Sequence, residues 1–565
     1  MHRITPSSPD GRILRDIDSL AKEIGLGPGD YEPYGRLKAK LVHGLADKYA
    51  DRPLAKYIGV TAINPTPLGE GKTVTVIGLA MALSQLGHTT IGTLREPSLA
   101  PVFGIKGGGA GGGNCTLEPQ SDINLHFTGD LHAVTSATNL LASIIDNHIA
   151  RRKIPEINPK TITWKRALDL CDKGLAHIIS GLDQPLQAPL RETGFDLTAA
   201  SEVMAILALA SGPRDLRLRL GRIVVGMTYE RQPVTVEQLG CTGAMAALLI
   251  DALRPNLVQS CEATPFLVHA GPFGNIAHGN SSIIADQIAL KLADYVVTES
   301  GFGADCGAEK FFDIKCRTSG LQPDAEVLVC TARALKLQSG LFDVHPGKPL
   351  PPALLEENLD ALHAGAVNLR AHLEIIQQYH LPTVVAINAF PDDSERELKE
   401  IQKIALEQGA AAAVITRAFS EGGEGSLALA AAVVEAAAQP NQFQYLYPLE
   451  MPIAEKIETI ATRIYGAASV EFEPQARRRM QEYEHSGYGD LPVCIAKTQY
   501  SLSHDPHLLG RPTGFTFPVR DWRLSAGAGF LYALSGEIRT MPGLPSEPAA
   551  LQIDIDDTGK IIGLH

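Results

Sequence analysis

A turn rich in glycine and proline directly follows a short apolar run, and this pairing constrains the fold more than any other feature. The run Tyr57–Ile63 is rich in β-branched residues, and the segment Pro65–Thr73 ends in Gly-Lys-Thr before a helix-like stretch. Glycines let backbone N–H groups approach phosphate oxygens, and the helix N-terminus adds a favourable dipole. In such a loop Lys72 would reach the β- and γ-phosphates, and the Thr73 hydroxyl would bind Mg²⁺. The pattern therefore predicts a triphosphate site.

The match to a phosphate-loop motif is incomplete at its first position. Thr66 stands where the motif G-x-x-x-x-G-K-[ST] has its first glycine. A turn that only caps a helix, with Lys72 in solvent, would need no such glycine. Other features of the sequence must therefore decide between a phosphate site and a simple helix cap.

Short β-branched runs alternate with longer helical patterns through most of the chain. Such alternation is typical of βαβ units, which build a mostly parallel sheet with helices on both faces. We expect strands at Tyr57–Ile63, Thr89–Leu94, Ile223–Thr228, Tyr295–Thr298, Glu326–Thr331, Thr383–Asn388 and Ala412–Thr416. We expect helices at Val74–Leu86, Leu131–Ile149, Ala199–Ala210, Ser281–Ala293, Glu356–Tyr379 and Ser394–Gln408. The sequence therefore predicts an α/β fold, with ligands beyond the carboxyl ends of the strands.

The length and the changes in composition along the chain indicate three parts. The 565 residues exceed one ordinary hydrophobic core. Proline and glycine cluster at Gly181–Gly194 and proline at His345–Pro352, and after Gln439-Pro440 the pattern changes to two helical runs. We predict a large P-loop-type domain with a mostly parallel sheet over residues 1–360, and two smaller α/β lobes at 361–450 and 451–565.

Charge and cysteine content narrow the class of protein. Acidic residues outnumber basic ones, 63 against 50, for a formal net charge of −13, which disfavours a nucleic-acid or anionic membrane surface. The eight cysteines are dispersed without a C-x-x-C motif, as expected for buried thiols in a reducing compartment. No apolar signal segment opens the chain, and no run reaches a membrane-spanning length, so we expect a cytoplasmic protein.

Segments near the expected strand ends carry groups suited to anion binding or proton transfer. Arg95 follows the second expected strand, and its guanidinium could hold a carboxylate or acyl phosphate, or simply pair with Glu96. The run Gly104–Gly113 could let its backbone approach an anion, or form a surface loop. Asp130, in the segment Asp122–His132, could belong to a Mg²⁺ or proton-transfer site, or cap the helix that follows.

Aromatic residues also follow expected strands. Phe302 lies between glycines, Phe390 follows the strand that ends at Asn388, and Phe419 comes just before a Gly-Gly-Glu-Gly turn. Three such residues favour a flat heterocycle held between rings, because ring stacking contributes about 0.5–1.5 kcal/mol per pair.

Two histidines, His269 and His278, invite comparison with a metal site. They are separated by nine positions through glycine and proline, a spacing that fits no standard zinc motif. We therefore expect loop packing or substrate contact at these residues.

Taken together, several blocks of the sequence resemble the formate–tetrahydrofolate ligase family, also called formyltetrahydrofolate synthetases, in its monofunctional form. The likeness runs from about residue 35 to the C-terminus. The blocks that carry it are Thr66–Thr73, Leu94–Leu99, Asp122–His132, Arg191–Asp196, Arg254–Gln259, His269–His278, Ala293–Lys315, Ala386–Pro391, Gly422–Gly425, Tyr488–Ser501 and Leu524–Pro545.

The resemblance implies an enzyme of one-carbon metabolism. ATP would phosphorylate formate to formyl phosphate, and N10 of tetrahydrofolate would attack the formyl carbon to give 10-formyltetrahydrofolate, ADP and phosphate. Such phosphoryl transfer needs positioning and charge neutralisation more than covalent help. The resemblance further implies ATP with Mg²⁺, a monovalent cation as a further candidate, and a homotetramer.

The resemblance also implies roles for individual residues. ATP would be bound by Thr66, Pro67, Leu68, Gly69, Glu70, Gly71, Lys72 and Thr73, with Thr73 also at the metal. The catalytic residues would be Lys72, Arg95 and Asp130. The folate-binding residues would be Phe390, Pro391, Phe419 and Phe302. Arg95 would hold formyl phosphate, and Asp130 would join the polar network around the attacking amine. Phe390 and Phe419 would enclose the pterin, whereas Phe302 would lie against a ring of either the nucleotide or the folate.

The chain departs from the family pattern in places. The family has Trp at the position of Phe419, and a small residue and a lysine at Ser420-Glu421. The smaller ring and the lost positive charge both predict weaker binding of folate and its anionic glutamate tail. Asn114 and Cys115 also differ from the pattern after the glycine run, and Phe342–Pro352 holds a proline-rich insertion.

Two other classes of function remain. A P-loop ATPase or switch protein would use the same loop, but it predicts neither Arg95 nor the strand-end aromatics. A non-catalytic folate binder would need none of Lys72, Thr73 and Arg95, which this chain retains. Release of ADP without formate or tetrahydrofolate would indicate the ATPase, and intact folding without turnover would indicate the binder.

Overall fold

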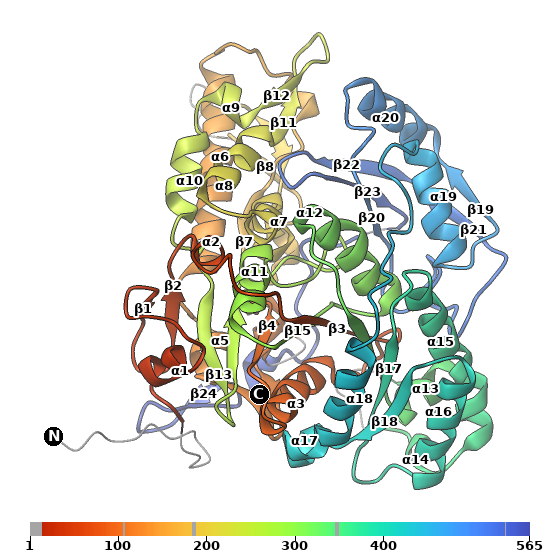
Figure 1. The fold of residues 1–565 in the computed structure, drawn as a ribbon. Coiled ribbons are helices and arrows are strands. Elements are labelled where there is room, and N and C mark those ends of the chain that lie inside the picture. The colour runs from red at the N-terminus through yellow and green to blue at the C-terminus, as the bar shows by residue number, and fades with distance from the viewer. Residues whose placement is uncertain (1–13, 105–107, 183–187, 345–349, 537, 565) are drawn as a thin grey trace.

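The computed structural model describes residues 14–104, 108–182, 188–344, 350–536 and 538–564. Within these residues, a twelve-stranded sheet forms the centre of the molecule (Figure 1). Its main strand order is β1 (Tyr31–Pro33), β2 (Ala39–Leu41), β13 (Asn256–Ser260), β14 (Pro265–Val268), β4 (Thr90–Leu94), β15 (Tyr295–Glu299), β3 (Lys56–Ala62), β16 (Ala325–Cys330), β17 (Thr383–Asn388) and β18 (Ala412–Thr416). From β14 to β18 all neighbours are parallel. The predicted α/β class with a large, mostly parallel sheet is confirmed.

Helices cover both faces of the parallel strands. The main ones are α3 (Lys72–Gln85) and α18 (Leu427–Ala437) on one face, and α11 (Ile283–Leu292), α13 (Ala332–Gln338) and α15 (Leu359–Gln377) on the other. Residues of β3 alternate between the two cores, because Ile58, Val60 and Ala62 pack with α3 whereas Tyr57 packs with α11 and α15. Since both faces are covered, these strands have nearly continuous apolar sequences.

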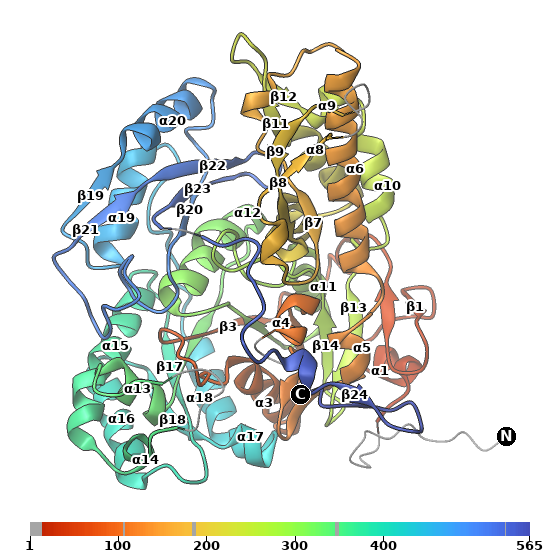
Figure 2. The same ribbon diagram turned by 180° about the vertical axis from the view of Figure 1, so that it is seen from behind.

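Two further groups of elements extend from the sheet. Around a separate hydrophobic core lie α6 (Asp130–Ala150), α7 (Glu202–Leu209), α8 (Pro213–Arg222), α9 (Val236–Leu239) and α10 (Thr242–Leu249). The C-terminal group holds α19 (Ile453–Arg463), β19 (Ser469–Phe472), α20 (Pro474–His485), β20 (Val493–Ala496), β21 (Thr516–Val519), β22 (Asp521–Ser525) and β23 (Phe530–Leu534). Figures 1 and 2 show these groups on opposite sides of the upper half of the molecule.

The remaining helices and strands complete the fold. The helices among them are α1 (Ile17–Glu23), α2 (Leu45–Lys48), α4 (Leu99–Phe103), α5 (Gln120–Asn124), α12 (Arg317–Ser319), α14 (Pro352–Leu355), α16 (Glu395–Glu407) and α17 (Ala418–Glu421). The strands among them are β5 (Gly111–Gly112), β6 (Cys115–Glu118), β7 (Arg166–Leu168), β8 (Ile178–Ser180), β9 (Arg191–Thr193), β10 (Phe195–Leu197), β24 (Asp554–Ile555) and β25 (Ile561–Ile562). Of these, β5 and β6 complete the twelve strands of the large sheet, because β6 pairs with both β13 and β5. The helices predicted from the sequence match α3, α6, α7, α11, α15 and α16 to within three residues at each end.

The membership of the sheet differs from the sequence prediction. The predicted strand Ile223–Thr228 forms β11 (Val224–Met227), but β11 pairs antiparallel with β12 (Pro233–Thr235) outside the large sheet. The large sheet instead contains β13 and β14, and the apolar-run criterion misses β13 because buried polar residues such as Asn256 and Gln259 interrupt it.

The large sheet extends across the predicted boundary at residue 360. Strands β17 and β18, in the predicted lobe 361–450, are hydrogen-bonded into the same sheet as β3 and β16. The boundaries at 360 and 450 stay predictions. Much of the predicted insertion Phe342–Pro352 lies outside the described residues.

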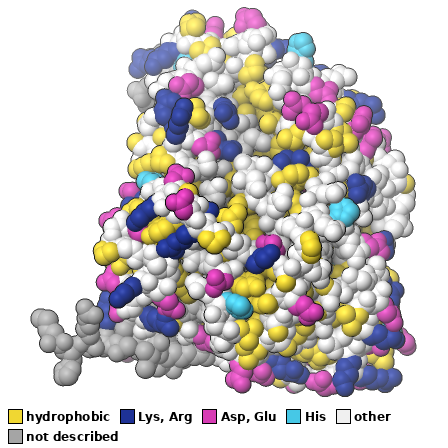
Figure 3. All heavy atoms as spheres, in the orientation of Figure 1, with side chains coloured by type: hydrophobic (Ala, Val, Ile, Leu, Met, Phe, Trp, Pro, Cys, Tyr) yellow, Lys and Arg dark blue, Asp and Glu magenta, His cyan; other side chains and the backbone are white. Residues whose placement is uncertain are grey.

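The structure bears on the expectations for the cysteines, for membrane-spanning helices and for surface charge. All eight cysteines are thiols that no disulfide joins, and apart from the half-buried Cys171 they are buried, as predicted. Across the described part of the chain, we find no helix that combines the length and the apolar character needed to cross a membrane. Acidic and basic side chains are interspersed on the face shown in Figure 3. The absence of a nucleic-acid partner stays a prediction.

Candidate functional site

The predicted phosphate loop, Pro65–Thr73, connects the carboxyl end of β3 to α3 in the middle of the parallel strands. Gly71, the N-cap of α3, has a φ of 78°, and Gly69 has a φ of 74°, a left-handed conformation that favours glycine. A Cβ on Gly71 would also lie 2.2 Å from Nδ2 of Asn388, at the end of β17. Gly71 supplies no side-chain acceptor to the first N–H groups of α3, an arrangement that favours an anion at the helix N-terminus.

An internal carboxylate binds the donors of this loop. Glu70 is only 3% exposed, and its Oε1 accepts a hydrogen bond of 2.6 Å from the N–H of Thr66. Its Oε2 lies 3.8 Å from Nζ of Lys72. A backbone N–H and an ammonium that interact with a carboxylate are equally suited to phosphate oxygens. Thr66 stands where the motif has its first glycine, and its backbone N–H is therefore one of the hydrogen-bond donors of the loop.

Glu299 joins the phosphate loop to Arg95. Glu299 is the last residue of β15, which lies between β3 and β4 in the sheet. Its Oε2 accepts a hydrogen bond of 2.6 Å from the Thr73 hydroxyl, and its Oε1 lies 3.5 Å from Nη2 of Arg95. Arg95 follows β4 and also donates to the carbonyl of Pro272 at 3.4 Å. The structure thus brings Thr73 and Arg95 together through a residue outside the set predicted from the sequence.

Asp130 lies in a buried polar network and is not the helix cap. It is the first residue of α6, whose N-cap is Gly129. Its carboxylate lies 2.7 Å from Nζ of Lys40 and accepts a hydrogen bond of 2.9 Å from Nδ2 of Asn256. Burial, followed by the charge of Asp130, raises the pKa of Glu96 well above its usual range. Glu96 thereby connects Asp130 to the backbone beside Arg95.

The two histidines of the loop after β14 are buried. Nε2 of His269 lies 2.7 Å from the carbonyl of Ala252, and Nδ1 lies 2.6 Å from the hydroxyl of Ser282. Burial lowers the pKa of His269 to about 4, and it lowers the pKa of His278 well below its usual value. Both rings are neutral at physiological pH, and His269 has the packing role that was one of the two expectations.

Phe390 and Phe419 follow the neighbouring strands β17 and β18. The guanidinium of Arg333 stacks 4.4 Å from the centre of the partly exposed Phe390 ring, and Pro391 beside it is exposed. Phe419 is 46% exposed, and one side of its ring packs on the glycine run, where a Cβ on Gly113 would lie 2.8 Å from the ring. Both rings keep open surface at the carboxyl edge of the sheet, where the phosphate loop also lies.

Phe302 lies on the Arg95 side of the site. Its φ of 61° is uncommon for a residue with a Cβ, and such strain clusters at ligand sites. A Cβ on Gly274 would lie 2.8 Å from the Phe302 ring, and a Cβ on Gly301 would lie 3.1 Å from Nη2 of Arg95. Phe302 therefore packs on the loop whose Pro272 carbonyl binds Arg95.

The departures from the family pattern contact one another. The N–H of Asn114 donates to the carbonyl of Phe419 at 2.8 Å, and the thiol of Cys115 donates to the carbonyl of Ala418 at 3.1 Å. Within the glycine run, a Cβ on Gly109 would lie 2.7 Å from Pro97. The run thus approaches other protein groups closely, and residues 105–107 lie outside the described part. Its contact with an anion stays a prediction.

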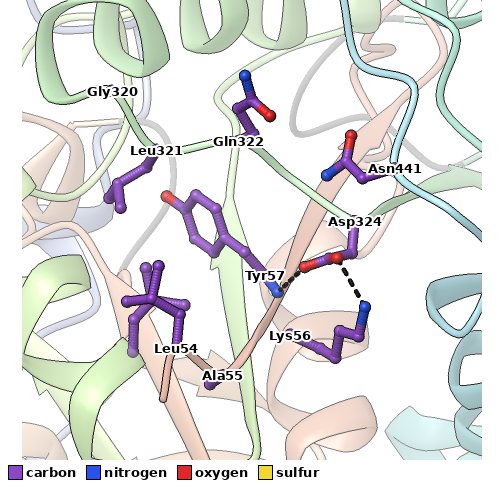
Figure 4. A pocket seen from close by; sticks show the side chains of 10 residues that line it. Leu54, Ala55, Lys56, Tyr57, Gly320, Leu321, Gln322, Asp324 and Asn441 are labelled. Carbon is purple, nitrogen blue, oxygen red and sulfur yellow. Dashed lines mark hydrogen bonds and ion pairs between the residues drawn. The ribbon is translucent and has the colours of Figure 1, made fainter. Parts of the chain in front are cut away.

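A separate pocket of about 300 Å³ lies at the opposite edge of the sheet (Figure 4). Lys56 and Tyr57, at the amino end of β3, line it together with Asp324, which precedes β16. Asp324 accepts hydrogen bonds of 2.9 Å from Nζ of Lys56 and from the N–H of Tyr57. Because ligands of parallel sheets bind at the carboxyl ends of strands, this pocket is not the candidate site.

Comparison with known proteins points to one family over the whole chain. The family model described as formate–tetrahydrofolate ligase matches residues 10–565. A formate–tetrahydrofolate ligase of Saccharopolyspora erythraea is 55% identical over 551 residues, which cover 98% of this chain and 97% of that protein. Proteins of the same name are 54% identical in a Roseiflexus species, with 98% of both chains covered, and 53% identical in Desulforamulus reducens, with 97% of both covered.

Proposed function

The chain belongs to the formate–tetrahydrofolate ligase family and is a ligase, and we propose that it couples ATP cleavage to the formylation of tetrahydrofolate. The reaction passes through formyl phosphate and gives 10-formyltetrahydrofolate, ADP and phosphate. The observation that carries this proposal is the contact from Thr73 through Glu299 to Arg95. This contact joins the loop to which we assign ATP with the guanidinium to which we assign formate.

We assign ATP to the loop Thr66–Thr73. The N–H groups at the start of α3 and the ammonium of Lys72 suit the phosphates. In the structure Thr66 and Lys72 interact with the Glu70 carboxylate, so the phosphates of ATP compete with an internal anion. Phosphoryl transfer depends on charge neutralisation and positioning, which makes Lys72 a catalytic residue as well as a binding residue.

The oxygen atoms around Thr73 fit Mg²⁺. The Thr73 hydroxyl and the Glu299 carboxylate are hard donors 2.6 Å apart. In the described ranges, no group of three or more His, Cys, Asp or Glu side chains could hold a metal alone. Phosphate oxygens and water would therefore complete the set, as is usual for Mg²⁺. Bound there, Mg²⁺ would neutralise charge on the phosphoryl group.

A monovalent cation has no assigned residue in this proposal. Turnover measured with and without potassium salts tests whether the enzyme requires one.

Arg95 binds formate and then formyl phosphate in this proposal. Its contacts of 3.5 Å to Glu299 and 3.4 Å to Pro272 are long for hydrogen bonds, so a substrate carboxylate can replace them readily. A formate oxygen attacks the γ-phosphorus and ADP leaves. N10 of tetrahydrofolate then attacks the formyl carbon, phosphate leaves, and the amine loses its proton. Asp130 and Glu96 contribute to the polar network around that amine.

The exposed rings at β17 and β18 are the proposed pterin site. Phe390 is partly exposed beside the Arg333 guanidinium, Phe419 is 46% exposed, and Pro391 is exposed. Stacking on such rings adds about 0.5–1.5 kcal/mol for each contact beyond the burial of surface. Phe302 packs on the Arg95 side, which favours a ring near the transferred group without choosing between nucleotide and folate.

A homotetramer and a cytoplasmic location complete the proposal. Both rest on the family resemblance and on the sequence. Light scattering of the purified protein over a range of concentrations tests the tetramer, and a stable monomer would contradict it.

An assay of ADP release tests the function. The wild type should release ADP only when both formate and tetrahydrofolate are present. Release without either cosubstrate would indicate an ATPase, and an intact fold without turnover would indicate a folate binder.

Removal of the Arg95 guanidinium tests the proposed formate site within that assay. The variant Arg95→Ala should abolish product and leave ATP binding largely intact. Near-normal turnover of this variant would contradict the role of Arg95.

A further inference from the structure

The chain segment after β20 contacts both sides of the proposed reaction site through Gln499. Its carbonyl oxygen accepts a hydrogen bond of 3.2 Å from Nδ2 of Asn64, and its side-chain Oε1 accepts one of 3.2 Å from Nδ2 of Asn275. Asn64 comes immediately before Pro65, where the phosphate loop begins. Asn275 lies three residues after Pro272, whose carbonyl accepts the hydrogen bond from Arg95. A half-buried glutamine thus joins the ATP side to the formate side.

A buried ion pair holds this segment in place. Nζ of Lys497 lies 2.6 Å from Oδ2 of Asp305, and both side chains are fully buried. The same ammonium donates to the carbonyls of Thr498 at 3.0 Å and Ser501 at 2.5 Å. Burial alone would raise the pKa of Asp305, but the charge of Lys497 holds it below its usual value. Since neither charge can lose its partner without a large penalty, the backbone around Gln499 has one favoured position.

Asp305 extends the connection to the entrance of the phosphate loop. Its Oδ1 accepts a hydrogen bond of 3.2 Å from Nδ2 of Asn64. Oδ1 of Asn64 in turn accepts one of 2.9 Å from Nδ2 of Asn368, on α15. Asn64 is completely buried, and the proline that follows it restricts the backbone further. The start of the phosphate loop is therefore fixed partly by residues of the C-terminal group.

The formate side is fixed in a similar way. Nζ of the buried Lys310 donates to the carbonyls of Gly274 at 3.0 Å and Asn275 at 3.4 Å. Lys310 lies between two π-helical segments, Ala304–Ala308 and Phe311–Cys316. π-Helical turns are frequent at functional sites. The loop that contacts Arg95 thus rests on the same buried charged segment that holds Lys497.

We propose that Gln499 is a positioning residue, which sets the distance between ATP on the phosphate loop and formate on Arg95. This inference rests on the proposed function. Transfer requires reacting atoms within roughly 3–3.5 Å, and a misplacement of about 1 Å can cost about a hundredfold in rate. Because the hydrogen bonds of Gln499 reach Asn64 and Asn275, its loss should lower kcat without weakening the binding of ATP.

The variant Gln499→Ala removes the acceptor of Asn275 and keeps the carbonyl that binds Asn64. With all three substrates saturating, kcat should fall about tenfold or more. The dissociation constant and the binding stoichiometry of a non-hydrolysable ATP analogue should stay unchanged. Gln499→Glu keeps an acceptor oxygen and should restore most of kcat. Gln475→Ala is the matched control, because Gln475 lies in the same group of elements and loses a hydrogen bond of equal length, 3.2 Å, to Asp521.

A double-mutant cycle assigns the effect to one bond. If Gln499 and Asn275 act through their mutual hydrogen bond, Gln499→Ala combined with Asn275→Ala should lose no more kcat than the larger single loss. Fully additive losses, or a normal kcat in Gln499→Ala, would overturn the proposal. So would a loss of kcat matched by a loss of analogue-binding sites, because this indicates a purely structural role. A wild type without formate- and tetrahydrofolate-dependent ADP release would instead reject the proposed function itself.

Discussion

The polar side of the site and its aromatic side are organised in opposite ways. On the polar side Lys72, Thr73 and Arg95 all interact with internal carboxylates, from Glu70 or Glu299. On the aromatic side Phe390 and Phe419 stay partly exposed without a carboxylate partner in the contacts described above. Charged groups removed from water must be compensated before the substrate arrives, whereas exposed rings are tolerated. Phosphates would therefore replace existing partners on a preorganised surface, while a pterin would simply cover apolar area.

We expect the largest loss of activity on the polar side, at Lys72. The variant Lys72→Ala should reduce ADP release by about a hundred- to a thousandfold, the range seen when one preorganised donor of a transition state is removed. The KM for tetrahydrofolate should stay within about twofold, because the ring faces are separate from the loop. Steady-state kinetics with each substrate varied in turn measures both quantities.

A lysine at the other edge of the sheet serves as the control for Lys72. Lys56 is paired with Asp324 in the separate pocket, and Lys56→Ala should leave turnover unchanged. Equal losses in the two variants would mean that general charge, and not the loop, governs the reaction.

Lowering the pH should decrease the free energy of unfolding through His269, which follows β14. The pKa of this buried ring is about 4 in the folded protein against 6.5 in the ordinary case. As the pH falls, the unfolded chain takes up the proton first, so the stability from the neutral ring is complete above pH 6.5 and is lost between pH 6.5 and 4. At pH 5 the loss relative to pH 7 should be about 2 kcal/mol. Urea unfolding at both pH values measures it.

The substitution His269→Gln isolates this contribution. The variant should show a difference between pH 7 and pH 5 that is smaller by about the same 2 kcal/mol. The exposed His177 provides the control, because His177→Gln makes the same substitution outside the core. An unchanged slope in His269→Gln would show that another group is responsible.

The two sides also differ in what the sequence could predict. The phosphate loop and Arg95 were predictable because each follows a β-branched run, and carboxyl ends of parallel strands meet at one edge. The contacts of Glu299 were not predictable, because they depend on β15 lying between β3 and β4, an order that alternation of runs does not determine. Asp130 shows the same limit. Its partner Lys40 lies 90 residues away, so the local pattern could only offer a cap or a network.

For Phe390 and Phe419, the sequence could predict the position of each ring but not the residues that pack against it. Their strand-end positions were predictable from the same runs, and their exposure supports the expected role. The support behind each ring was not predictable, since Arg333 and the glycine run reach them from other parts of the chain. Local patterns thus predicted which residues face the edge, whereas tertiary contacts determine how each one is held.

The smallest expected effect lies on the aromatic side, at Phe419. The variant Phe419→Ala should raise the KM for tetrahydrofolate up to about tenfold and change kcat little, because a stacked ring contributes about 0.5–1.5 kcal/mol. Phe419→Trp should lower the KM below that of the wild type, since the larger ring covers more of the pterin. Tyr229→Ala removes another exposed aromatic, 59% exposed against 46% for Phe419, far along the chain and should have no effect on either constant. A kcat that fell with an unchanged KM would place Phe419 with the polar side, and the contrast between the two sides would then be wrong.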